Sequence, residues 1–235
     1  MPKINVYLPD SLADAVRDTG VPVSAVCQRA LEQAVRRITG VRQTVVGELD
    51  SAELAGRLPL FTARAVTALT LAIDRARDTG APNVTTRHLL HGMLAEGGNL
   101  ALQILTAMEI DPGTITVPDG AEPGGGEGLR FSAPAANAVE LTVAEATGLG
   151  HNYVGCEHLL IGLAAEPDGQ AGRTLRDLGA DARATRRAVS VALAGYAHLR
   201  ASATDPAAAS GLRTAVRAEL APLLRRIERL EESRG

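Results

Sequence analysis

The sequence predicts a mostly α-helical protein, and three observations lead to that fold class. Residues 1–40 combine one alternating apolar stretch with two stretches of helical periodicity. The centre of the chain repeats a helical pattern at a fixed offset of 70 residues. Residues 212–235 carry an apolar seam at helical spacing. We therefore expect an N-terminal strand with two helices, an all-α double-repeat domain and a C-terminal helix.

Composition excludes several function classes. The chain has 235 residues and a net charge of −3, and its only lysine is Lys3, so a nucleotide-binding P-loop is excluded. Cys27 and Cys156 lie far apart without partners at ligand spacing, which argues against a disulfide framework or a zinc site. We expect no cofactor, no metal and no catalytic set, and therefore no enzyme. With no signal peptide and no apolar membrane span, we expect a cytoplasmic protein.

Residues 1–40 predict a strand followed by two helices. The strand covers residues 1–9, with apolar and polar side chains on opposite faces (Ile4, Val6, Leu8 and Lys3, Asn5, Tyr7). A helix over 11–19 ends at Gly20, and a second over 25–38 begins after the N-cap Ser24 and ends at Gly40. Forty residues cannot bury a core as a monomer, so this region predicts a homodimer.

This strand–helix–helix pattern resembles the ribbon-helix-helix family of DNA-binding repressors. The resemblance implies that two chains pair their strands and place Lys3, Asn5 and Tyr7 in the major groove of double-stranded operator DNA. It also implies that Ser24 binds a phosphate at the start of the second helix. The alternative is a strand that only adds to the sheet of a partner.

After an expected linker at 41–58, residues 59–195 form the repeated region. Its copies, 61–111 and 131–181, align without a gap. Each copy predicts three helices: the first begin after Thr62 and Ser132 and end at Gly80 and Gly150, and the second begin near Thr85 and Gly155. The third helices carry paired leucines (Leu102, Leu105 and Leu175, Leu178). Two such copies together can bury one small core.

The sequence GHNYVGCEHLLIGL at 150–163 resembles the repeat of the Clp N-terminal domain. That domain receives substrates and adaptors at the front of ClpC-type and ClpA-type unfoldases. The resemblance covers roughly 59–195 and implies a receptor domain, here without the ATPase modules.

The resemblance also implies a site for phosphorylated arginine. The phosphate would lie at the hydroxyl-capped helix start and the guanidinium at a glutamate, and Ser132 and Glu157 match these positions in the second repeat. In the first repeat Thr62 matches, but Arg87 stands at the glutamate position, so we expect one of the two sites to be lost or altered. The alternative is that Thr62 and Ser132 are ordinary N-caps and that Glu157 is a solvated acid.

Two further pairs of residues recur in the repeats. The family domain docks hydrophobic cyclic peptides around a phenylalanine that matches Phe61 and Phe131, which alternatively are hydrophobic staples. His88 and His158 are expected to be structural hydrogen-bonding residues near a helix start.

Two Gly-, Pro- or Ala-rich stretches, 117–129 and 196–211, predict linkers. Beyond them, the seam in 212–235 is interrupted by Pro222, which should kink the helix (Val216, Leu220, Leu223, Ile227 and Leu230). We expect this helix to support dimerisation or to pack on the body of the chain.

Together these patterns predict a dimeric DNA-binding transcriptional regulator. Its Clp-N-like domain would sense or sequester a phosphoarginine protein, a degron-bearing protein or a hydrophobic cyclic peptide. The alternative is a non-ATPase adaptor or decoy of Clp proteolysis that binds substrates, adaptors or Clp protease components without binding DNA. In that case residues 1–40 would serve only to dimerise.

Overall fold

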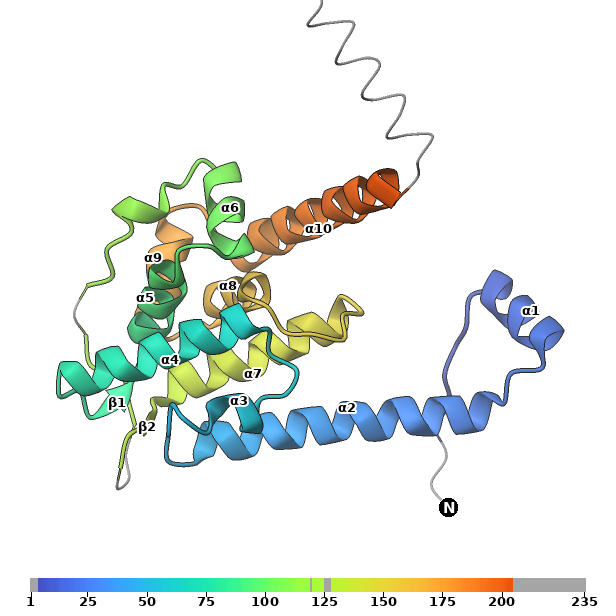
Figure 1. The fold of residues 1–235 in the computed structure, drawn as a ribbon, viewed down its shortest axis with the longest axis horizontal. Coiled ribbons are helices and arrows are strands. Elements are labelled where there is room, and N and C mark those ends of the chain that lie inside the picture. Colours follow the sequence, from blue (N-terminus) through green and yellow to red (C-terminus); the bar gives the residue numbers. More distant parts are fainter. Residues whose placement is uncertain (1–3, 119, 125–127, 205–235) are drawn as a thin grey trace, which may run out of the picture. The chain divides into compact units, whose positions relative to one another are not determined.

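The computed structural model describes residues 4–118, 120–124 and 128–204. By its internal contacts the described part of the chain divides after Thr185 into two compact units. Figure 1 shows the order of the elements, which are helices apart from two very short strands in the described ranges.

Each repeat contains the three helices that the sequence predicts. The first repeat contains α4 (Ala63–Asp78), α5 (Thr86–Glu96) and α6 (Leu100–Ala107). The second contains α7 (Ala133–Gly148), α8 (Cys156–Ala165) and α9 (Gln170–Asp177). Gly80 and Gly150 follow α4 and α7 with φ of +62° and +76°, the left-handed conformation that ends many helices. The predicted helix order is confirmed.

Small side chains bring the two long helices of each repeat close together. Gly92 of α5 lies against α4, where an added Cβ would lie 2.8 Å from the Ala72 nitrogen. Gly162 of α8 lies against α7, where an added Cβ would lie 2.6 Å from the Ala138 oxygen. The remaining core is aliphatic and includes Leu69, Ile73, Leu89, Leu90, Met93, Leu159, Leu160, Ile161 and Leu163. The two helix pairs are therefore packed in the same way.

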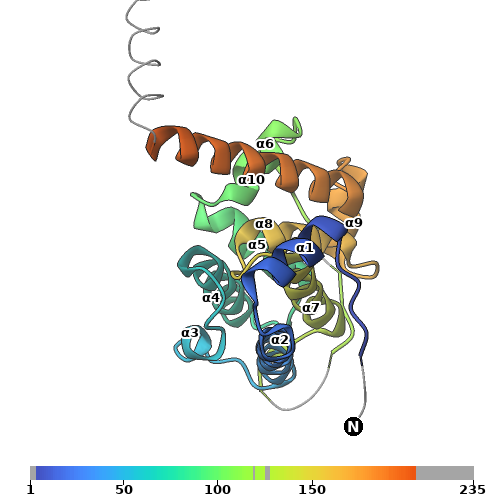
Figure 2. The same cartoon turned by 90° about the vertical axis from the view of Figure 1, so that its right-hand side faces the viewer.

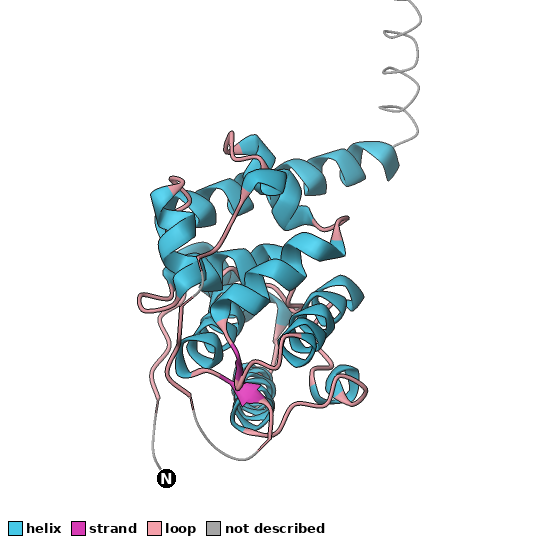
Figure 3. Cartoon of the chain, turned by 90° about the vertical axis from the view of Figure 1, so that its left-hand side faces the viewer, coloured by secondary structure: helices cyan, strands magenta, loops and turns pink. Residues whose placement is uncertain are grey.

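Short parallel pairings connect the repeats. Strand β1 (Asn83–Val84) pairs with β2 (Arg130–Phe131), and Val84 lies opposite Phe131. Phe61 forms the corresponding bridge with Val154. Figure 3 shows the paired strands among the helices. Since Phe61 and Phe131 are equivalent, and so are Val84 and Val154, each pairing takes one half from each repeat.

The N-terminal region contains two helices, α1 (Asp10–Thr19) and α2 (Val23–Val46). The first confirms the helix predicted at 11–19. Residues 4–9 form no strand in the structure, in contrast to the prediction for 1–9, because a strand needs a partner for its backbone groups and a single chain supplies none here. Helix α1 buries no residue.

Helix α2 continues past Gly40, where the sequence predicts its end. Glycine inside a helix costs only about 1 kcal/mol, and packing offsets that cost. Val41 and Thr44, one turn apart, are both at least 95% buried, and α2 contacts α7. Figure 2 shows α2 below α7.

The segment 41–58, predicted as a linker, is packed in the structure. It contains the end of α2 and the short helix α3 (Leu54–Arg57). Leu49, Leu54 and Leu58 are buried, and the Leu49 amide donates to the Leu129 carbonyl at 2.9 Å. Burial of these leucines provides the free energy that holds the segment on the repeats.

Helix α10 (Ala182–Thr204) includes part of the range 196–211 that the sequence predicts as a linker. Residues 205–235, with the predicted helix at 212–235, lie outside the described residues. Within the described ranges, no helix has both the length and the apolar character that crossing a bilayer requires.

Candidate functional site

Residues 61–62 run beside residues 154–155, and we call this place the Thr62 crossing. The Thr62 amide donates to the Val154 carbonyl at 2.9 Å, and the Val154 amide donates to the Leu60 carbonyl at 2.8 Å. The Thr62 hydroxyl accepts from the Ala65 amide at 3.2 Å, which makes Thr62 the N-cap of α4. Gly155 is the N-cap of α8. The crossing therefore brings the starts of α4 and α8 together.

In the equivalent arrangement, residues 131–132 run beside residues 84–85, and we call this place the Ser132 crossing. The Ser132 amide donates to the Val84 carbonyl at 2.9 Å, and the Ser132 hydroxyl accepts from the Ala135 amide at 3.2 Å. Ser132 is the N-cap of α7 and Thr85 is the N-cap of α5. This crossing therefore brings the starts of α7 and α5 together.

The crossings correct the pairing of site residues expected from the repeats. The sequence pairs Ser132 with Glu157 and Thr62 with Arg87, because each pair belongs to one repeat. The structure instead places the start of α8, with Glu157, at the Thr62 crossing, and the start of α5, with Arg87, at the Ser132 crossing. The hydroxyl and the carboxylate that the resemblance requires thus belong to the two helix starts that meet at the Thr62 crossing.

Glu157 is not the solvated acid of the alternative interpretation, since its exposed fraction is only 5%. Its carboxylate lies over Gly155 and accepts a hydrogen bond from Tyr153. Burial raises the pKa of Glu157, while its own backbone amide and Tyr153 act in the opposite direction. A guanidinium that binds this carboxylate must compete with the Tyr153 hydroxyl.

The Ser132 crossing holds a carboxylate that no sequence pattern indicates. Glu122 lies within the predicted linker 117–129, yet its exposed fraction is only 8%. It accepts hydrogen bonds from Thr86, Ser132 and Gln170, which are 36, 10 and 48 residues away. No local pattern marks contacts at such separations.

Phe61 and Phe131 are 8% and 7% exposed. Both therefore contribute to the core at the two crossings rather than to an open aromatic surface. A cyclic peptide that docks here would contact mainly their neighbours.

The two equivalent histidines have the structural role that the sequence predicts. His88 Nδ1 accepts from the Thr85 amide at 3.0 Å, and His158 Nδ1 accepts from the Gly155 amide at 2.9 Å. Burial, and then the neighbouring His151, lowers the pKa of His158 to about 4. The short distance of 3.4 Å between His158 and Glu157 is therefore no ion pair at neutral pH.

The candidate DNA-binding residues remain on the surface where they are described. Lys3 lies outside the described residues. Asn5, Tyr7 and Ser24 are exposed, and Tyr7 is 95% exposed. Ser24 lies within the first turn of α2 rather than at the predicted N-cap, because the helix begins at Val23.

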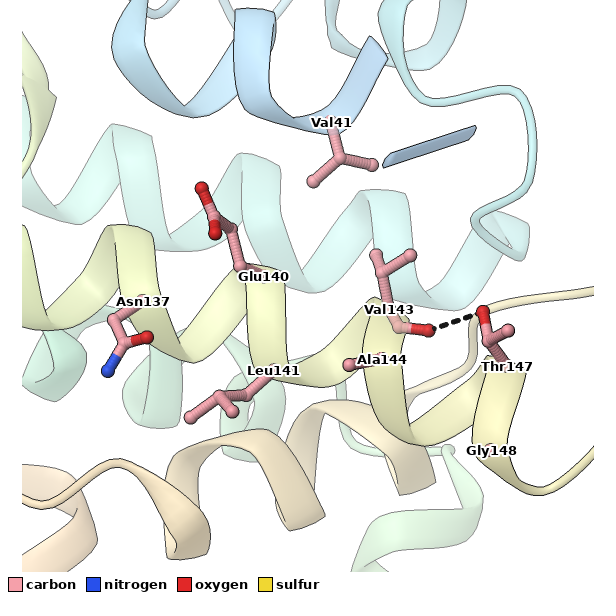
Figure 4. Close-up of a pocket in the computed structure, with 8 residues that line it drawn as sticks. All are labelled: Val41, Asn137, Glu140, Leu141, Val143, Ala144, Thr147 and Gly148. Atoms are coloured by element: carbon pink, nitrogen blue, oxygen red, sulfur yellow. Dashed lines mark hydrogen bonds between the residues drawn. The ribbon is translucent and has the colours of Figure 1, made fainter. Parts of the chain in front are cut away.

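A separate cavity of about 480 Å³ lies between α2 and α7. Figure 4 shows Val41 pointing from α2 toward α7, while Glu140 and Val143 point from α7 toward α2. The walls are mostly apolar, and the cavity is separate from both crossings.

In the described part of the chain, the crossings contain neither a reactive thiol nor a cluster of metal-binding side chains. Burial, followed by the nearby Glu157, raises the pKa of the Cys156 thiol to about 12, so it remains protonated at neutral pH. Among the described residues, no three or more His, Cys, Asp or Glu side chains are grouped so that they could hold a metal ion.

The family model of the Clp repeat N-terminal domain matches residues 60–117 and 130–221. The chain belongs to this family. It is 39% identical over 126 residues to the chloroplastic ClpA homolog of Brassica napus and to the chloroplastic chaperone protein ClpC1 of Arabidopsis thaliana. The match covers 52% of this chain but only 14% of either relative.

A third relative and a solved structure match similar parts of the chain. The ClpA homolog of Porphyra purpurea is 35% identical over 150 residues, which is 62% of this chain and 18% of the relative. The N-terminal domain of ClpD from Arabidopsis thaliana is 25% identical, with a TM-score of 0.40, over 57% of this chain and 95% of that chain.

Proposed function

We propose that this chain is a cytoplasmic receptor that binds proteins presented to Clp proteolysis, acting as an adaptor or decoy and not as an enzyme. The relatives are named as ATP-binding subunits of the Clp protease or as Clp chaperones, and the shared part is the Clp repeat domain. The observation that carries the proposal is the meeting of the Thr62-capped start of α4 with the Glu157-bearing start of α8.

The Thr62 crossing suits a ligand with one negative and one positive group. Helix starts bind anions through their amide groups and the helix dipole. A carboxylate binds a guanidinium through charge-assisted hydrogen bonds. Glu157 stands at the second position of α8, so phosphorylated arginine, which joins both groups in one side chain, is the proposed ligand. A protein whose degron contains phosphorylated arginine would present the same chemistry.

A titration with a phosphoarginine peptide tests this function. We expect one binding event on the full chain, with affinity reduced at least tenfold in Thr62→Ala and in Glu157→Gln. The equivalent change Arg87→Gln serves as the matched control, because Arg87 belongs to the other crossing, and it should leave the affinity within twofold. Absence of binding to the wild-type chain, or equal loss in Arg87→Gln, would contradict the proposal.

A second candidate function concerns residues 1–40. Ten large apolar side chains between residues 4 and 35 are exposed (Ile4, Val6, Tyr7, Leu8, Leu12, Val21, Val23, Val26, Leu31 and Val35). Such an apolar surface favours burial against a second copy of the chain. We propose that residues 1–40 form a homodimer and that the polar face of its paired strands contacts operator DNA.

Two measurements test dimerisation and DNA binding separately. Light scattering of Val6→Glu should give a monomer where the wild-type chain gives a dimer. An electrophoretic shift with upstream promoter DNA should be lost in Asn5→Ala without a change in oligomeric state. If the dimer binds no DNA at low salt, the DNA-binding function is contradicted. Residues 1–40 would then serve only to dimerise the receptor.

A further inference from the structure

The Glu122 carboxylate is bound at the starts of three helices. Its Oε2 accepts from the Thr86 amide at 2.9 Å and from the Ser132 hydroxyl at 2.6 Å. Its Oε1 accepts from the Thr86 hydroxyl and from the Gln170 amide at 3.1 Å. Thr86 begins α5, Ser132 caps α7 and Gln170 begins α9. A buried carboxylate thus has four donors from three elements.

These donors form a site for an oxyanion rather than an ion pair. Two are backbone amides at helix starts, two are hydroxyl groups, and none is a cationic side chain. Helix starts carry partial positive charge, and three of them converge on the same two oxygens. Phosphate and carboxylate both satisfy such an arrangement, because each presents several acceptor oxygens.

The fold of the crossing does not depend on this carboxylate. The Thr62 crossing keeps the same parallel pairing and the same hydroxyl cap, with Cys156 at the position of Thr86. The chain leading to Phe61 differs from the chain leading to Phe131, because it forms helix α3 (Leu54–Arg57). In the part of the chain that the structure describes, no carboxylate accepts a hydrogen bond from Thr62 or Cys156. Glu122 is therefore an addition to a shared framework.

The backbone on both sides of Glu122 is fitted closely to the site. A Cβ on Gly120 would lie 2.9 Å from the Gln170 Cδ, and a Cβ on Gly124 would lie 2.7 Å from the Asn83 side chain. The Pro123 carbonyl accepts from the Ala133 amide at 2.7 Å. Glycine permits this close approach, and the hydrogen bond fixes the segment beside the start of α7.

We infer that Glu122 is an intramolecular ligand that occupies an oxyanion site at the Ser132 crossing and closes it to external phosphate groups. A ligand attached to the chain competes at a high effective concentration, so a free anion cannot displace it at ordinary concentrations. At the Thr62 crossing, the described residues include no carboxylate bound to the capping hydroxyl in this way. This inference concerns a different site from the proposed receptor function and stands without it.

Inorganic phosphate tests the inference on the full chain. We expect phosphate to raise the Tm of Glu122→Ala by about 3 °C at ten times its Kd, measured against chloride at equal ionic strength. The wild-type chain should shift by less than about 1 °C, and so should Glu53→Ala, a matched control at an exposed glutamate. The double variant Glu122→Ala with Ser132→Ala should lose the response, because it lacks one of the donors.

Amide NMR spectra provide the second measurement, which does not need the alanine variant to be stable. Phosphate should move the amide signals of Thr86 and Gln170 in Glu122→Gln and leave them unchanged in the wild-type chain. Movement of these signals in the wild-type chain would overturn the inference, because the site would then be open. A folded Glu122→Ala chain without a phosphate response would also overturn it. Neither result bears on phosphoarginine binding at Thr62.

Discussion

The Thr62 crossing and the Ser132 crossing share one backbone arrangement but contain different polar groups. Both join the start of a first helix to the start of a second helix from the other repeat. Glu157 lies beside the Thr62 crossing, and Glu122 fills the Ser132 crossing. Packing of the aliphatic core fixes the backbone in both, so the polar residues at the crossings can diverge without loss of the fold.

The largest expected loss of stability tests whether the two helix pairs, α4 with α5 and α7 with α8, are packed equivalently. Gly92→Ala and Gly162→Ala should each lower the free energy of unfolding by about 3 kcal/mol, because the added methyl group overlaps the facing helix backbone. Urea unfolding at 25 °C measures both. Gly148→Ala is the control, since nothing lies within 4 Å of its added Cβ. Costs that differ by more than about 2 kcal/mol would show that the two helix pairs are not equivalent.

The second prediction concerns the pH dependence of the free energy of unfolding and compares the two buried histidines, His158 and His88. The folded pKa of His158 is about 4 against a usual value of 6.5, so between these values the unfolded chain binds more protons. Stability present at pH 7 is therefore lost as the pH falls from about 6.5 to 4, by an amount on the order of 3 kcal/mol.

His158→Gln should remove this part of the pH dependence, measured as the free energy of unfolding between pH 4 and 7. His88→Gln is the matched variant. Burial, and then Arg87, lowers the pKa of His88 too, so its contribution has the same sign. An unchanged pH profile in His158→Gln would assign the acid sensitivity to other groups.

The smallest expected effect compares the two N-caps. Ser132 both caps α7 and donates to the Glu122 carboxylate, whereas the Thr62 hydroxyl caps α4. Ser132→Ala should therefore cost about 2 kcal/mol and Thr62→Ala about 1 kcal/mol. Thermal unfolding of both variants measures the difference. If Glu122→Ala is introduced first, the two costs should become equal, and a difference that persists would show that Glu122 is not its source.

Helix positions in the repeats followed from local signals in the sequence. The N-caps Thr62 and Ser132 and the glycines after α4 and α7 act within a few residues of the helix ends that they define. The offset of 70 residues repeated these signals in the second copy, and the motif at 150–163 indicated the family whose model matches the chain.

Other features required contacts that no local pattern contains. Helix α2 passes Gly40 because Val41 and Thr44 are buried, which the preference of glycine for helix ends does not predict. Residues 4–9 form no strand in a single chain although their alternation is clear, since a strand depends on a partner.

The sequence by itself determined the two repeats, their helices and the hydroxyl groups that cap them, because capping and apolar periodicity act over a few residues. Only the tertiary structure decided that Thr62 meets the helix of Glu157 and that Ser132 binds Glu122. Both results depend on how the repeats cross, and the crossing is set by burial of one common core between them. Burial favours contact between apolar surfaces whatever their separation along the chain.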